Sequence, residues 1–93
     1  MNEGPVYRRG EVLWRRTYDR VVLLVPGSGE LVTLQATACD LWAALEEPGS
    51  LGELAERLAA LYDAPLDQIA SDIEPVLQDL GRRGALAVRC RRD

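Results

Sequence analysis

The sequence predicts an α+β fold, in which a three-stranded antiparallel sheet is followed by a bundle of three helices. Three short apolar segments come first, and the connections between them are too short for a crossover, so neighbouring strands must run antiparallel. Three segments with apolar residues at helical spacing follow. Strands grouped before helices are typical of an antiparallel sheet with helices packed on one side. The 93 residues suffice for a single domain.

The three strands are predicted over residues 11–17, 20–25 and 30–35. Tyr18 and Asp19 supply the first turn, and the run Pro-Gly-Ser-Gly at residues 26–29 supplies the second. The middle strand is apolar without interruption from residue 21 to residue 25, which is typical of a central strand covered at least in part on both faces.

The first two helices are predicted on either side of a Pro-Gly break at residues 48–49. The first covers about residues 36–45. The second begins after Ser50, which is a suitable N-cap because Glu53, three residues later, completes a capping box. Its apolar residues between Leu51 and Tyr62 recur on one face of the helix.

The third helix is predicted from residue 66 to Arg82 or Arg83, with Gly84 as the residue that ends it. Pro75 lies inside this segment. It either kinks the helix between residues 71 and 74 or marks the junction of two shorter helices.

The two ends of the chain carry weaker patterns. Residues 1–10 are expected to form a poorly ordered lead-in with a short strand around Val6 and Tyr7. Residues 86–88 are expected to add another short strand, and residues 89–93 to fray.

The composition argues against an enzyme. The chain has no His, so Ser-His and Cys-His pairs are excluded, and no group of residues has the spacing of metal ligands. Cys39 is predicted to be a buried thiol and Cys90 an incidental one, without a disulfide. We expect no cofactor. No apolar run is long enough for a membrane span, and the N-terminus lacks the pattern of a signal peptide, which predicts a cytoplasmic protein.

Three helices with a small sheet also describe a winged helix-turn-helix arrangement, a shape that often binds DNA. The net charge is −4, and residues 36–80 contain ten acidic residues and one Arg. Duplex binding depends on basic residues that neutralise phosphates. The acidic helices therefore argue against nucleic acid as a partner, although the Arg-rich tail of residues 81–93 keeps a DNA-binding regulator as an alternative.

The third strand favours a different partner. In a three-stranded meander it lies at an edge, and residues 31–34 contain neither Pro nor a charge that would discourage pairing. Such an edge is suited to receive an extended peptide as an added strand. Asp72, Asp79, Arg82 and Arg83 on the third helix would line one wall of a groove beside it. The alternative is that the third helix or the C-terminal segment covers this edge.

Three segments, in order, resemble the PqqD-like proteins, and the resemblance implies one domain whose core covers about residues 10–88. Residues 34–38 with Leu41, Trp42 and Leu45 are similar to the family pattern L-N-x-T-A…I-W-x-L. Residues 50–63 are similar to T-x-x-E-L…L…Y-D, and residues 72–86 to D-V-x-x-F-L-x-x-L-x-x-x-G-L. The chain departs from these patterns at residue 35, where Gln replaces Asn, and at residues 75–76, where Pro and Val replace a helix former and Phe.

This resemblance implies a bacterial peptide-recognition element (RRE) for ribosomally synthesised, modified peptides, most like the free-standing B1 proteins of lasso peptide pathways. It implies that a precursor's leader segment adds to the third strand, packs against the third helix and is handed to a separate cysteine protease or other modifying enzyme. A PqqD-type chaperone for a radical enzyme, and an adaptor that binds only a partner protein, remain alternatives. The expected peptide-binding residues are Glu30, Leu31, Val32, Thr33, Leu34, Asp72, Val76, Asp79, Leu80 and Arg83.

Two points about the sheet stay open at this level. Val32 and Leu34 share one face and Leu31 and Thr33 the other, but the alternation does not say which face is buried. The apolar run of residues 21–25 cannot lie entirely against the helices. We therefore expect its outer face to dock the protease or a second copy, and Val22→Glu and Leu23→Glu, each made separately, are the changes that would test this.

Overall fold

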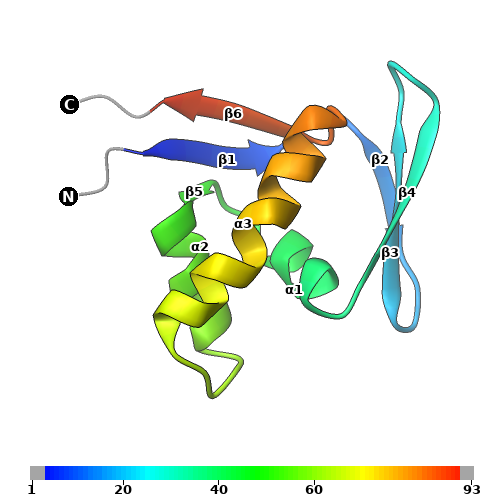
Figure 1. Cartoon of the computed structure of the whole chain (residues 1–93). Helices are drawn as coiled ribbons and strands as arrows, with labels where there is room; N and C mark the ends of the chain where they lie inside the picture. The colour runs from blue at the N-terminus through cyan, green and yellow to red at the C-terminus, as the bar shows by residue number, and fades with distance from the viewer. Residues whose placement is uncertain (1–3, 91–93) are drawn as a thin grey trace.

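The computed structural model describes residues 4–90 and shows a sheet, three helices and a second, smaller sheet (Figure 1). Its elements are β1 (Pro5–Arg9), β2 (Leu13–Arg16), β3 (Arg20–Val25), β4 (Glu30–Gln35), α1 (Thr37–Ala44), β5 (Gly49–Ser50), α2 (Leu51–Ala59), α3 (Leu66–Arg82) and β6 (Leu86–Cys90). The predicted antiparallel meander is β2-β3-β4, and the three helices follow it as expected. None of the helices in the described part of the chain has the length and apolar character to cross a membrane.

Strand β3 is the centre of the meander and lies between β2 and β4. Its residues Val21, Leu23 and Val25 are buried against the helices, whereas Val22 and Leu24 on the opposite face are only partly covered. Of the two positions named to test the outer face, Val22 lies on it and Leu23 does not, because Leu23 is 0% exposed. The period of two places Leu24 there instead.

The helices supply most of the core. The capping box at the start of α2 is present: the Glu53 amide donates to Ser50 Oγ at 3.2 Å, and the Ser50 amide donates to Glu53 Oε1 at 2.9 Å. Helix α3 continues through Pro75 as one helix, so the alternative of two short helices is wrong. The buried helical side chains are Cys39, Leu41, Trp42, Leu54, Ala55, Leu58, Ile69, Ile73, Leu77 and Leu80.

Helix α3 ends where predicted, at a glycine in the left-handed region. Gly84 has φ 85°, and its amide donates to the carbonyl of Gly81 at 3.1 Å. The Ala85 amide donates to the carbonyl of Leu80 at 2.9 Å. These two bonds form a Schellman motif, which turns the chain directly from α3 into β6.

The short strand expected around Val6 and Tyr7 is present, but it extends over Pro5–Arg9, so this part of the N-terminal segment is not a poorly ordered lead-in, and residues 1–3 lie outside the described residues. This strand is β1, which pairs antiparallel with β6 from Pro5 opposite Cys90 to Arg9 opposite Leu86, and with β5 on its other side. Strand β6 also includes Arg89 and Cys90, which were expected to fray, whereas residues 91–93 lie outside the described residues. In Figure 1 β1 and β6 run side by side as the blue and red strands.

The junction between β4 and α1 requires an unusual backbone conformation. Ala36, the N-cap of α1, has φ 54° and ψ −127°, and it is the sole non-glycine residue with positive φ among the described residues. A side chain in this region costs on the order of 1–3 kcal/mol. The strained residue lies where the edge strand β4 turns into helix α1.

Replacing Ala36 with Gly should relieve this strain. Gly also destabilises the folded state by roughly 0.5–1 kcal/mol, because it gives the unfolded chain more conformational entropy. We therefore expect Ala36→Gly to leave the free energy of unfolding unchanged or to raise it by about 1 kcal/mol. The control Ala43→Gly, at an exposed position inside α1, should lower it by about 1 kcal/mol. Urea denaturation measures both variants, and equal losses would show that Ala36 is not strained.

Candidate functional site

Strand β4 has one free edge. Among the described residues it pairs only with β3. The hydrogen bonds at the two ends of β3, from Thr17 N to Arg20 O and from Gly29 N to Val25 O, fix which residues of each strand face which neighbour. Because an antiparallel ladder alternates, the backbone groups of Glu30, Val32 and Leu34 face β3, and those of Leu31, Thr33 and Gln35 point away from it.

The same alternation settles the direction of the β4 side chains. Leu34 is buried and Val32 partly buried against the core, whereas Thr33 is exposed and Leu31 is 68% exposed. Val32 and Leu34 therefore face inward, which resolves the alternative left open by the sequence.

A groove of about 470 Å³ lies between β4 and α3. It is lined by Leu31, Val32, Thr33 and Leu34 of β4, Ala38 of α1, and Pro75, Val76, Asp79, Leu80 and Arg83 of α3 and its C-cap. Leu34 and Leu80 are fully packed in the core, and Val32, Ala38 and Val76 are partly buried against it. The groove thus has an apolar floor, with the unpaired edge of β4 as one wall and α3 as the other.

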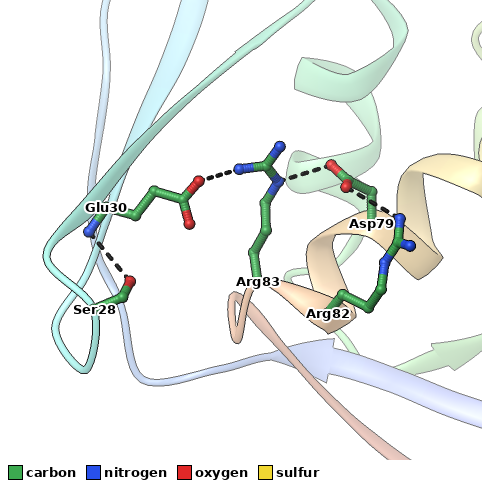
Figure 2. A network of polar contacts seen from close by, with 5 residues as sticks. All are labelled: Ser28, Glu30, Asp79, Arg82 and Arg83. Atoms are coloured by element: carbon green, nitrogen blue, oxygen red, sulfur yellow. Dashed lines mark hydrogen bonds and ion pairs between the residues drawn. The ribbon is translucent and has the colours of Figure 1, made fainter.

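Charged side chains cross one end of the groove. Arg83 forms an ion pair with Glu30, and its Nε donates to Asp79 Oδ2 at 2.9 Å (Figure 2). Asp79 also receives a longer bond of 3.4 Å from Arg82. The hydrogen bond from Arg83 is the main reason that the pKa of Asp79 is lowered and that of Arg83 is raised. The side chains of Glu30, Asp79 and Arg83 are about two-fifths exposed, so the ion pairs that join β4 to α3 contribute little to stability.

The structure brings most of the predicted peptide-binding residues together. Eight of the ten line the groove, and Glu30 adjoins it through Arg83. Asp72 does not line it, because it lies one helical turn before Val76 and the groove follows only the C-terminal half of α3. Sequence reasoning missed Ala38 and Pro75 as lining residues. Ala38 lies within the first motif, and Pro75 was considered only for its effect on the helix.

Comparisons with known proteins point to one family. The family model described as "Coenzyme PQQ synthesis protein D (PqqD)" matches residues 20–86. A solved structure described as TbiB1 in complex with the TbiA(beta) leader peptide is similar, with a TM-score of 0.77 and 25% identity, over 85% of this chain and 93% of that chain. A search of curated proteins finds no significant match.

The ion pair across the groove can be measured by a double-mutant cycle. We expect Glu30→Gln and Arg83→Gln to show a coupling energy below about 1 kcal/mol that falls towards zero in 1 M salt, because both groups are half exposed and screened. The matched cycle of Glu30→Gln with Arg82→Gln should show no coupling, since Arg82 contacts Asp79 instead. Equal coupling in the two cycles would contradict the arrangement in Figure 2.

Proposed function

Because the chain belongs to the PqqD family, we propose that it binds the leader segment of a ribosomally synthesised precursor peptide and catalyses no reaction itself. The observation that carries this proposal is the open edge of β4 beside an apolar groove. The similarly folded TbiB1, solved in complex with a leader peptide, supports a ligand of the same kind here.

The leader binds by strand addition to β4. The backbone groups of Leu31, Thr33 and Gln35 that point away from β3 are available to an extended peptide, which would become the fourth strand of the meander. An added strand of about six residues gains about four to six hydrogen bonds, each worth roughly 1 kcal/mol net. Ordering a flexible leader opposes this gain by several kcal/mol. Backbone pairing alone therefore does not give tight binding.

Side chains of the leader supply the remaining affinity. In an added strand every second side chain points to the same face, so alternate leader residues enter the groove over Val32, Val76 and Leu80. This apolar floor fits a branched or aromatic anchor. Asp79 and Arg83 at the rim fix the end of the bound segment through polar contacts. Asp72, one helical turn before Val76, lies outside the groove and would contact a leader only where the leader extends past the groove.

The outer face of the same sheet is the proposed docking surface for a processing enzyme. Leu13, Leu24 and Leu31 lie directly opposite one another on the three strands, and Leu13 and Leu31 are about two-thirds exposed. An enzyme seated there would lie next to the leader on β4. We propose that this enzyme is the leader protease of a lasso peptide-type pathway, to which the chain delivers its bound precursor.

Thr33→Pro tests strand addition. The variant removes an amide that points away from β3, so the β3–β4 ladder stays intact while an added strand loses one donor and meets the proline ring. We expect the affinity for the leader of the accompanying precursor to fall at least about tenfold, the equivalent of about 1.4 kcal/mol. Fluorescence anisotropy measures the affinity, and circular dichroism verifies folding.

The control for this experiment is Thr33→Val, which changes the side chain but keeps the amide. It should bind the leader within about twofold of the unchanged protein. A folded Thr33→Pro variant that binds as tightly as Thr33→Val would rule out pairing along β4.

Leu24→Glu tests the docking surface. A charge in the middle of the outer face should abolish co-purification with the leader protease while the affinity for the leader stays within about twofold, because residue 24 points away from the groove. The control Gln68→Glu adds the same charge at an exposed position of α3. If Leu24→Glu and Gln68→Glu retain the protease equally, the enzyme docks elsewhere.

A further inference from the structure

The meander has a second free edge, on the opposite side from the groove. Among the described residues β2 pairs only with β3, and all four of its residues are exposed. The bond from Thr17 N to Arg20 O fixes the alternation, so Leu13 and Arg15 bond to β3 while the backbone groups of Trp14 and Arg16 point outward. Two N–H and two C=O groups are thus available along β2.

A pocket of about 290 Å³ lies beside this edge, between β2 and α1. The guanidinium of Arg9 lies over the rings of both Trp14 and Trp42, at 4.7 and 4.9 Å from their centroids. The Arg9 Nε and Nη2 atoms both donate to the carbonyl of Trp42, at 3.2 and 2.7 Å. The two indoles meet edge to face at 5.9 Å. This stack builds a rigid aromatic wall from three separate elements.

One buried donor of a residue that lines the pocket has no acceptor. Trp42 is 1% exposed, and its Nε1 has no hydrogen-bond partner. A buried donor without an acceptor destabilises the folded state by about 1–3 kcal/mol. Burial lowers the pKa of Arg9, and Glu46, which also lines the pocket, only partly opposes this effect. An acceptor that carries negative charge in the pocket would stabilise the Arg9 guanidinium, which lies beside it.

The charged residues around the edge of β2 also favour a negatively charged ligand. Arg9, Arg15, Arg16 and Arg20 lie on or beside β2, against three acidic residues: Glu11, two residues before the strand, Asp19, which pairs with Arg20, and Glu46. This end of the sheet is therefore basic in a chain whose net charge is −4. Pairing of β2 with β2 of a second copy would bring Arg15 and Arg16 close to the same residues of the other chain, and like charges across a strand pair are destabilising.

We propose that the edge of β2 is a second strand-addition site, which receives an acidic extended segment of a partner protein and places a carboxylate side chain in the pocket of Arg9, Trp14 and Trp42. The site is distinct from the groove at β4 and does not depend on leader binding. The two edges of one sheet would then bind different extended segments, the leader at β4 beside α3 and the acidic segment at β2. The partner is held by main-chain bonds at Trp14 and Arg16 and selected by charge.

The test uses the full chain and two fluorescein-labelled probes, a short peptide of alternating Glu and Val and its twin with Gln in place of Glu. We expect the acidic peptide to bind and the Gln peptide to bind at least about tenfold more weakly, because charge-assisted hydrogen bonds are about twice as strong as neutral ones. Failure of the acidic peptide to bind, or equal affinity for both peptides, would overturn the proposal.

Hydrogen exchange locates the bound peptide. With the acidic peptide present, the amides of Trp14 and Arg16 should exchange more slowly and the Trp42 indole N–H resonance should shift. Slower exchange at Leu31 and Thr33 alone would assign the peptide to the groove and contradict the proposal. As a second arm, Arg16→Pro should bind about tenfold more weakly than Arg16→Ala, which lacks the same charge but keeps the amide. Equal affinity of the two folded variants would also contradict it.

Discussion

The feature on which the account depends is a row of backbone groups on β4 that has no partner among the described residues. Unpaired N–H and C=O groups at a sheet edge attract any extended chain, and most proteins protect such an edge with charges, Pro or a covering element. Here the edge from Leu31 to Leu34 carries none of these. It opens instead onto a groove with an apolar floor, and side chains that enter this groove would make pairing along the edge selective.

The rest of the fold holds the two walls of the groove at a fixed separation. Leu34 on β4 and Leu80 on α3 both belong to the core, so neither wall can move without disturbing buried packing. The Schellman motif at Gly84 fixes the end of α3, and the conformation of Ala36 fixes the turn from β4 into α1. The half-exposed ion pair between Arg83 and Glu30 spans the walls, but it is too weak to set their distance.

Local patterns in the sequence were sufficient for the parts of this site that depend on local structure. The bounds of β3 and β4 follow from apolar runs between turn residues, and the capping box at Ser50 and the stop at Gly84 follow from neighbouring residues. The sequence could not predict that Leu23 is buried and Leu24 is not. In a continuous apolar run both faces of the strand are apolar, so the pattern does not show which face packs against the helices. Pairing of β1 with β6, from opposite ends of the chain, leaves no local pattern either. The stack of Arg9 on Trp14 and Trp42 depends on that pairing, and it escaped prediction for the same reason.

The most direct test of the central claim is amide hydrogen exchange with and without the precursor's leader. The account predicts that leader binding slows exchange at Leu31, Thr33 and Gln35, whose amides point away from β3, and leaves Val32 and Leu34, already bonded to β3, nearly unchanged. If the leader binds and these three amides exchange as quickly as before, the open edge of β4 is not the receptor.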